Sequence, residues 1–334
     1  MMTRRDLLRS LGLAGGAHVL SGPRPVAAQP PLETTRVRLI RSPDVCLAPL
    51  YVAEEELLRG EGFTEVQYVQ GTGGQDDINL AATGATDFIG GFVGRHLAGL
   101  DAGDPIVILS GLHIGCFELF GNERVRSIRD LKDKQVAVTR LTSGRHIFLS
   151  VMAGHVGLDP RRDIQWVTDP VERSIRLFAD GEIDAFMAFP PEPQELRTKK
   201  IGHVVVNTTV DRPWSQYFCC MVVSNREFVR KHPVATKRAL RAILKANSVC
   251  ALEPARAAQI LKGKWYPKMN YDYGLQTIKE IPYGQWRAYD PEDTVRFYAL
   301  RMNEVGMIKS SPQKLIAQGT DWRFLNELKK ELKA

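Results

Sequence analysis

One pattern occurs twice in this chain, as Leu80-Ala-Ala-Thr-Gly84-Ala-Thr-Asp87-Phe88 and as Leu177-Phe-Ala-Asp-Gly181-Glu-Ile-Asp184-Ala185. In both copies an apolar helical stretch runs into a glycine, an aspartate follows three residues later, and an apolar strand-like segment begins. Glycine suits the left-handed residue that ends a helix, because it has no Cβ to clash there. Each copy therefore predicts the end of a helix and the start of a strand.

An unusual loop follows each of these strands. The first is Gly90-Gly91-Phe92-Val93-Gly94-Arg95-His96, and the second is Phe189-Pro190-Pro191-Glu192-Pro193. Two related α/β units that each end a strand in such a loop predict two lobes that face one cleft. The alternative is that Gly-x-x-Asp recurs by chance, as it can in any α/β protein.

The length and composition fit a two-domain globular protein. The chain has 334 residues, of which 44% are hydrophobic and 25% charged. No uninterrupted apolar run approaches the ~20 residues needed to cross a bilayer. We therefore expect a soluble mature protein.

The N-terminus has the pattern of a twin-arginine export leader. Paired arginines in Thr3-Arg4-Arg5-Asp6-Leu7 precede a modest apolar stretch at 11–20, and Val26-Ala27-Ala28 offers small residues to a signal peptidase. An amphipathic helix is the alternative, but several glycines and prolines in 12–25 oppose it. We predict a leader at 1–28, cleavage after Ala28 and a periplasmic location, without a lipid anchor because no cysteine lies at the junction.

The charge does not indicate nucleic-acid binding. Without residues 1–28, which carry four arginines and one aspartate, the formal net charge falls from +7 to +4. The remaining basic residues alternate with acids, as in Glu327-Leu-Lys-Lys-Glu-Leu-Lys333, which is typical of a solvated helix face.

Strand-like and helix-like segments alternate along the chain, which predicts mainly parallel sheets. A strand-poor, helix-rich remainder after 233 suggests that the chain goes out to a second lobe and returns to the first. We therefore predict lobe one at 36–120 plus 222–334, lobe two at 121–221, and a hinge of crossover strands near 118–122 and 217–223. The predicted strands are 37–41, 65–69, 106–110, 135–139, 163–167 and 204–207, and the main helices are 50–59, 145–156, 170–179 and 233–251.

Ligands in open α/β sheets bind beyond the carboxyl ends of strands, beside helix N-termini. Loops at such positions carry hydroxyls, glycines and carboxylates, and aromatic side chains near them could form walls, although such rings more often belong to a core. Three prolines fix the backbone around Glu192, whose carboxylate could meet an amine or an arginine across the cleft. The candidate ligand-binding residues are Ser42, Asp44, Cys46, Gly73, Gly91, Phe92, His113, Thr142, Ser143, Gly144, Phe189, Glu192, Trp214 and Tyr217.

The spacing of cysteines and histidines predicts neither a metal site nor a catalytic centre. No Cys-x-x-Cys or nucleophile-elbow motif is present, and the Cys219-Cys220 pair lies in an apolar strand-like run. In an oxidising compartment a disulfide can form, and Cys46 with Cys116 is the expected pair because both follow predicted strands near one sheet edge.

Several motifs together carry a resemblance to a known family over about residues 36–260. The chain resembles the solute-binding proteins of ABC importers, in the nitrate/taurine/alkanesulfonate group related to the thiamine-pyrimidine synthase family. The segments that carry it are Ala48-Pro-Leu-Tyr51-Val-Ala-Glu-Glu, Leu80 to Phe88, Ser127-Ile-Arg-Asp-Leu-Lys-Asp-Lys-Gln-Val-Ala137, Gly157-Leu-Asp-Pro160, Asp180-Gly-Glu-Ile-Asp-Ala185 and Asn225-Arg-Glu-Phe-Val-Arg-Lys-His-Pro233.

The resemblance implies a two-lobed type II periplasmic-binding fold, with mixed sheets flanked by helices and a cleft between the lobes. It implies a monomer, peripheral to the membrane, without cofactor, that closes on a small solute by hinge motion. The solute would be of sulfonate, nitrate, pyrimidine or aromatic acid type, and the partner would be the transmembrane subunits of an ABC permease.

Two other functions share this fold. A pyrimidine synthase-like enzyme would need a lysine for pyridoxal phosphate, but the chain has none before Lys132. A periplasmic ligand sensor would use the same cleft, and the sequence does not separate it from an importer component.

Overall fold

The chain folds around two five-stranded sheets in the part that the structure, a computed structural model, describes, residues 30–72 and 75–332. The predicted leader and Gly73 lie outside these residues. The first sheet has the order β2-β1-β3-β10-β4, and the second has the order β7-β6-β8-β5-β9. The strands are β1 (Arg36–Arg41), β2 (Glu65–Gln70), β3 (Phe88–Phe92), β4 (Ile106–Ile114), β5 (Glu118–Gly121), β6 (Lys134–Val138), β7 (Ile164–Thr168), β8 (Ala185–Ala188), β9 (His203–Asn207) and β10 (Phe218–Asn225).

Both sheets are mixed and share one topology. In the first sheet β1 pairs parallel with β2 and β3, and β10 runs antiparallel between β3 and β4. In the second, β6 pairs parallel with β7 and β8, and β5 runs antiparallel between β8 and β9. The antiparallel strand of each sheet directly follows a segment that leaves the other sheet. The predicted α/β class with mixed sheets is confirmed.

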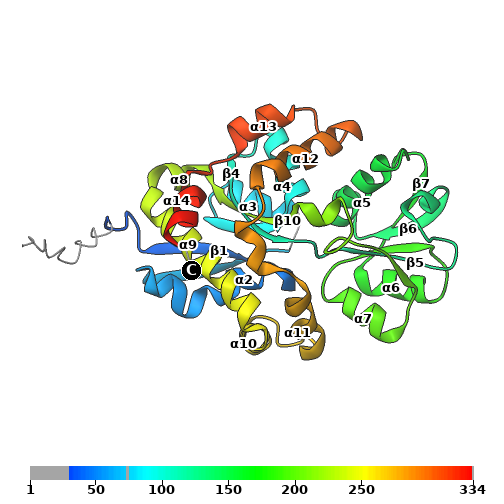
Figure 1. Ribbon diagram of the computed structural model, residues 1–334, viewed down its shortest axis with the longest axis horizontal. Helices are drawn as coiled ribbons and strands as arrows, with labels where there is room; N and C mark the ends of the chain where they lie inside the picture. The colour runs from blue at the N-terminus through cyan, green and yellow to red at the C-terminus, as the bar shows by residue number, and fades with distance from the viewer. Residues whose placement is uncertain (1–29, 73–74, 333–334) are drawn as a thin grey trace, which may run out of the picture. The chain divides into compact units, whose positions relative to one another are not determined.

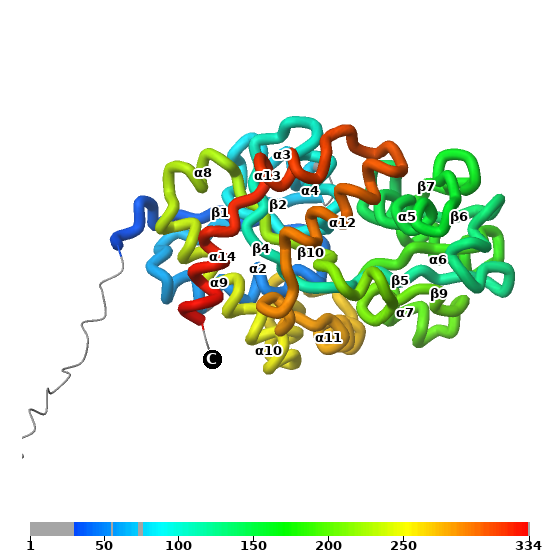
Figure 2. Tube along the Cα trace, turned by 45° about the horizontal axis from the view of Figure 1, so that its top comes forward, coloured from blue at the N-terminus to red at the C-terminus, as the bar shows by residue number. Residues whose placement is uncertain are grey.

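Helices flank both sheets. The second sheet is accompanied by α5 (Gly144–His155), α6 (Val171–Ala179) and α7 (Glu192–Lys199), drawn in green in Figure 1. The C-terminal helices, yellow to red, lie around the first sheet in Figures 1 and 2, with α13 and α14 against β4. The other helices are α2 (Ala48–Val52), α3 (Gln75–Ala82), α4 (Val93–Ala102), α8 (Arg226–Lys231), α9 (Pro233–Leu252), α10 (Pro254–Ile260), α11 (Tyr271–Glu280), α12 (Pro291–Glu304), α13 (Pro312–Gly319) and α14 (Arg323–Glu331), with short turns η1 (Val45–Leu47), η2 (Glu54–Leu58), η3 (Ile128–Leu131), η4 (Trp214–Gln216), η5 (Leu261–Trp265) and η6 (Tyr283–Arg287).

The glycines of the repeated pattern have the predicted conformation. Gly84 follows α3 with a φ of +73°, and Gly181 follows α6 with a φ of +76°. Strand β3 then begins at Phe88 and strand β8 at Ala185. Both copies therefore perform the same step, a left-handed helix end that feeds the third parallel strand of a sheet.

The aspartates of the pattern also have equivalent roles. The Asp87 carboxylate accepts a hydrogen bond from the backbone N–H of Arg38 in β1 at 2.7 Å. The Asp184 carboxylate accepts one from the backbone N–H of Gln135 in β6 at 3.0 Å. Each aspartate thus ties the start of its own strand to the first of the three parallel strands of the same sheet, which explains the spacing in physical terms.

The core lies where the helices cover both faces of the first sheet. Strands β4 and β10 are buried along their whole length, as expected for strands packed on both sides. Helix α9 confirms the helix predicted at 233–251, and it packs against α2 and β4. Among the described residues, the helices lack the combination of length and apolar character that a membrane span requires.

Residues 115–117 join β4 to β5, and residues 208–217 join β9 to β10, so the chain crosses between the sheets at these two places. Gly115 is tightly packed at the first crossing. It has a φ of +59°, and a Cβ there would lie against the backbone of Thr209, closer than real Cβ atoms approach. The two crossings therefore touch one another.

Replacing Gly115 by alanine should destabilise the protein by at least about 3 kcal/mol, because backbone strain and a clash with a second backbone add together. Gly181→Ala is the matched control, since Gly181 has a similar φ of +76° but open space around it. That control should cost only about 1–2 kcal/mol. Urea unfolding of both variants measures the difference, and equal losses would refute the tight crossing.

Candidate functional site

A cavity of about 280 Å³ lies where segments of both sheets meet. The first sheet contributes the loop after β1 and the β3–α4 junction, and the second contributes the β6–α5 loop and the residues after β8. Its lining residues are Pro43, Asp44, Thr72, Gly91, Phe92, Arg95, Phe117, Thr139, Arg140, Ser143, Gly144, Arg145, Val171, Phe189 and Cys220. The two loops that follow the repeated pattern thus reach the same cavity.

Arg95 is the most notable cation of this cavity. It lies in the first turn of α4, and its Nε is buried without a hydrogen-bond partner. Among the described residues, the Arg95 guanidinium forms no hydrogen bond and no ion pair. The neighbouring His96 adds no charge, because burial and the nearby Arg95 lower its pKa to about 3. A positive charge is therefore available to a ligand in the cavity.

The N-terminus of α5 lies on the other side of the cavity. Ser143 is its N-cap, and the Ser143 hydroxyl accepts a hydrogen bond from the backbone N–H of His146. A Cβ on Gly144 would lie 3.7 Å from the Arg95 side chain and 3.5 Å from the Phe92 ring. A helix start with unpaired N–H groups and an arginine therefore face the same small volume, an arrangement that attracts anions.

Arg145 lines the cavity but its charge is already paired. Its guanidinium forms a two-pronged ion pair with Glu192, at 2.6 and 2.7 Å, and also donates to the Met187 carbonyl at 2.7 Å. Glu192 additionally accepts a hydrogen bond from the Phe189 backbone N–H at 3.0 Å. The arginine that Glu192 meets therefore belongs to segments of the same sheet and does not lie across the cleft as predicted, and Glu192 itself is not a lining residue of the cavity.

Asp44 brings a carboxyl group to the cavity. Burial raises the pKa of Asp44 to about 6, although the nearby Arg95 lowers it. No hydrogen bond of the Asp44 carboxyl group to a described residue is found. A ligand that offers a hydrogen-bond donor beside its anionic group would match Asp44 and Arg95 together.

Aromatic rings form a continuous wall of the cavity. The Phe92 and Phe117 ring centroids are 5.5 Å apart, and those of Phe117 and Phe189 are 4.9 Å apart. Phe148 stacks behind Phe92 at 5.0 Å. These rings exclude water and favour a ligand with a flat or apolar body.

The structure brings together six of the residues that were predicted from sequence: Asp44, Gly91, Phe92, Ser143, Gly144 and Phe189 all line the cavity. Sequence reasoning missed Arg95, Arg140 and Cys220, which also line the cavity, whereas Phe117 was recognised as a possible aromatic wall but was not included among the candidate residues. The available signal for Arg95 was its place in the glycine-rich loop after the first copy of the pattern.

Three other predicted residues, Ser42, Trp214 and Tyr217, contact neighbouring side chains and do not line the cavity. Ser42 is buried, and its hydroxyl hydrogen-bonds the Asp77 carboxylate. Trp214 is buried edge-on against Phe148, and Tyr217 stacks on Phe297 of α12 with centroids 3.9 Å apart. These two aromatic rings pack into a core that helix α12 completes, rather than lining the cavity.

Thr142 lines a second cavity of about 470 Å³, which is bounded by α4, α5 and α12 and shares only Arg95 with the first. The walls of this second cavity include Ile147, Trp166 and Met302. Thr142 therefore does not share the cavity that Ser143 and Gly144 line.

The expected disulfide between Cys46 and Cys116 is wrong, because all five cysteines are free. The two residues do approach each other, but together with His113 and Cys220. The Cys116 sulfur lies 3.2 Å from that of Cys219. Cys46, Cys116 and His113 are buried beneath the cavity rather than on its lining.

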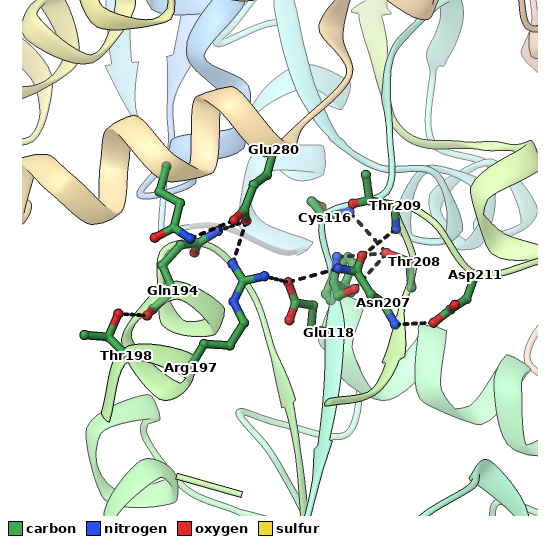
Figure 3. Close-up of polar contacts among 12 residues, drawn as sticks. Cys116, Glu118, Gln194, Arg197, Thr198, Asn207, Thr208, Thr209, Asp211 and Glu280 are labelled. Carbon is green, nitrogen blue, oxygen red and sulfur yellow. Dashed lines mark hydrogen bonds and ion pairs between the residues drawn. The ribbon is translucent and has the colours of Figure 1, made fainter. Parts of the chain in front are cut away.

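A polar network outside the cavity joins α7, beside the second sheet, to α11 (Figure 3). Arg197 forms an ion pair with Glu280 at 2.6 Å and with Glu118 at 3.2 Å. The Gln194 amide donates to Glu280 at 2.9 Å. Burial raises the pKa of Glu118 to about 7, although Arg197 lowers it. Glu280 therefore connects a C-terminal helix to a helix of the second sheet.

Known proteins resemble this chain in sequence and in fold. Over 110 residues this chain is 29% identical to the bicarbonate-binding protein CmpA of Synechococcus elongatus. The matched stretch is 32% of this chain and 24% of CmpA, so the chain spans about a quarter of the length of that curated relative. The periplasmic nitrate-binding protein NrtA from Synechocystis PCC 6803 superposes with a TM-score of 0.76 at 15% identity, over 91% of this chain and 90% of that chain. The alkanesulfonate-binding protein SsuA from Xanthomonas axonopodis pv. citri, bound to MOPS, superposes with a TM-score of 0.68 at 16% identity, over 87% of this chain and 100% of that chain.

These likenesses confirm the predicted periplasmic-binding fold. The family model described as NMT1-like family matches residues 33–262, which is well over half of the chain and contains both sheets. The chain belongs to the NMT1-like family.

Proposed function

We propose that this protein is an extracytoplasmic solute-binding protein, which captures a small organic anion and delivers it to an ABC permease. The observation that carries the proposal is the Arg95 guanidinium, which has no hydrogen bond or ion pair with a described residue and faces the N-terminus of α5 across the cavity. Arg95 is half-buried and its Nε atom is fully buried, so a ligand that supplies a negative charge and a hydrogen-bond acceptor would offset the cost of desolvating this group.

The relatives support an anionic solute. The names and titles of the three similar proteins give bicarbonate, nitrate and the sulfonate MOPS, all of which carry negative charge. The aromatic wall of Phe92, Phe117 and Phe189 favours an organic anion over nitrate or bicarbonate, because a small inorganic ion would leave the rings without contacts. Sulfonates and aromatic acids are therefore the favoured classes.

Export is part of the same proposal. The paired Arg4 and Arg5 and the Ala28 cleavage site support a periplasmic location, where a solute-binding protein meets its permease. The two chain crossings beside 118–122 and 217–223 are the proposed hinge, with lobe one at 36–120 plus 222–334 and lobe two at 121–221. We propose a monomer, as its partner is the permease rather than a second copy.

A pyridoxal phosphate enzyme is not favoured. Among the described lining residues of the cavity there is no lysine that could form a Schiff base. The proposed activity is therefore binding and release, without chemical change of the solute.

A ligand panel tests the proposal directly. Purified mature protein is titrated with alkanesulfonates, aromatic carboxylates, nitrate and neutral pyrimidines, and the melting temperature is followed. We expect at least one organic anion to raise the melting temperature in a saturable manner, since a ligand that binds only the folded state stabilises it. A shift with neutral pyrimidines alone would contradict an anion site.

Removal of the Glu280 carboxylate should loosen the connection between α11 and α7, because Glu280 binds both Arg197 and Gln194. Glu280→Gln breaks the ion pair between Glu280 and Arg197, whose side chains are 34% and 30% exposed, respectively. Because the pair is partly exposed, we expect the contact between the two helices to lose at most about 1 kcal/mol and the solute affinity to fall by no more than about fivefold. Small-angle scattering should show a larger radius of gyration without solute. The control is Lys199→Gln, which breaks an exposed pair within α7 and should leave the radius unchanged.

A further inference from the structure

A cluster of potential metal ligands lies directly beneath the solute cavity. One ligand atom each of Cys46, His113, Cys116 and Cys220 lies within 4.8 Å of the others. All four residues are buried, with at most 5% of any of them exposed. Three sulfurs and one imidazole nitrogen form a donor set that suits thiophilic metal ions.

The fold assembles this cluster from four places. Cys46 lies in η1 after β1, His113 near the end of β4, Cys116 in the crossing at 115–117, and Cys220 in β10. His113 and Cys220 are paired neighbours in adjacent antiparallel strands. The four ligands are therefore held by the first sheet and by the crossing, which are among the most buried parts of the protein.

The hydrogen bonds of His113 orient its ring for a metal. Its Nδ1 lies 2.9 Å from the Gly115 carbonyl oxygen and 3.3 Å from that of Ile114, so Nδ1 carries the proton and donates it. The lone pair then resides on Nε2, and this buried atom has no hydrogen-bond partner among the described residues. A carbonyl on one ring nitrogen and a metal on the other is the usual arrangement of a metal-binding histidine.

We propose that Cys46, His113, Cys116 and Cys220 bind a single Zn²⁺ in a closed, four-coordinate site. A tetrahedral zinc with bonds of about 2.3 Å to sulfur and about 2.0 Å to nitrogen sets its ligand atoms about 3.5–3.8 Å apart. The observed limit of 4.8 Å allows this geometry with small side-chain adjustments. The site needs no solute, so metal binding can be tested independently of the proposed transport function.

A metal ion would join four ligands that come from separate segments of the chain, so its binding is linked to the stability of the fold. A divalent ion stabilises the thiolates, and metal binding then contributes to folding. Because Cys220 also lines the cavity, the zinc would form part of its floor.

A disulfide is the competing outcome. The Cys116 and Cys219 sulfurs are 3.2 Å apart, and oxidation would remove one of the four ligands. The zinc-bound state and the Cys116–Cys219 disulfide exclude one another, so one experiment can distinguish them.

The test measures metal content and thiol state in the same preparation. The full chain is produced without a histidine tag in zinc-supplemented medium and dialysed against metal-free buffer. We expect elemental mass spectrometry to find about one zinc ion per chain. After chelation, Co²⁺ should restore one equivalent and give thiolate-to-cobalt charge-transfer absorption with the visible bands of a tetrahedral site.

Variants locate the metal. Cys46→Ala and His113→Ala should reduce zinc content to near zero, whereas Cys250→Ala should retain about one equivalent. Cys250 is the matched control, because it is buried in α9 but does not belong to the cluster.

The cobalt spectrum of the wild-type chain does not depend on how the variants fold. Absence of the charge-transfer band in reduced wild-type protein would overturn the proposal. A Cys116–Cys219 disulfide found by peptide mapping in protein from the periplasm, or bound copper in place of zinc, would overturn it as well. A failed solute panel with one zinc per chain would leave this inference intact and refute only the transport proposal.

Discussion

Replacing Arg95 by glutamine should weaken binding of the organic anion by about 10–150-fold. A hydrogen bond to a charged group contributes roughly 1.5–3 kcal/mol, and this range corresponds to that change in Kd. Glutamine is shorter and retains only an uncharged amide donor, so the loss reports the removal of the charged guanidinium group as a whole. Isothermal titration with the best ligand of the panel measures the effect.

The control for this variant is Arg173→Gln. Arg173 lies on α6 with 61% of its side chain exposed, pairs with Asp169 and is not part of the cavity lining. Removing its charge lowers the net charge of the protein by the same amount, so a general electrostatic effect would appear in both variants. Equal affinities of Arg95→Gln and wild type would exclude Arg95 from the site.

Replacing Arg145 by methionine should destabilise the protein by about 3–5 kcal/mol. The side chains of Arg145 and Glu192 are only 11% and 13% exposed, and removal of the arginine leaves a carboxylate in a largely buried position without its partner. Urea unfolding of the variant without ligand measures this loss.

The double variant Arg145→Met with Glu192→Gln should recover part of that stability, because no uncompensated charge remains. Lys199→Met breaks the exposed Lys199–Glu195 pair and should change stability by less than about 1 kcal/mol. If the single Arg145 variant were as stable as the Lys199 variant, the buried ion pair would not contribute to the architecture of the cavity.

Local sequence signals were sufficient to predict much of the fold. Gly84 and Gly181 predicted two helix ends because a positive φ at that position nearly requires glycine. The alternation of apolar strands and helices then indicated two α/β units, which the sheets confirm. These features depend on neighbours within about ten residues in the chain, so they are legible without tertiary information.

The site was less accessible to sequence reasoning because its contacts are long-range. Trp214 and Tyr217 lie near a strand end, but Phe297, which is distant in sequence, packs against both of their rings. In the sequence Arg95 resembles any basic residue at a helix start. Only the folded structure shows that α5 lies beside Arg95 and that its Nε has no hydrogen-bond partner among the described residues.

The cysteine cluster was missed for the same reason. Its ligands come from segments that are distant in the sequence and meet only in the folded protein. Their spacing along the chain therefore lacks the short repeats of common zinc motifs. His113-Ile-Gly-Cys116 was the one local signal, a histidine and a cysteine three residues apart. Without the position of Cys220 in β10, that signal alone did not indicate a site.

The central claim is that the cavity around Arg95 holds a small organic anion, and native mass spectrometry tests it most directly. The protein is isolated from its native cells without denaturation, and the mass of the bound molecule is determined after its release. We predict one small organic anion per chain, present in wild type and absent from Arg95→Gln. A neutral or cationic molecule, retained equally by both proteins, would contradict the account.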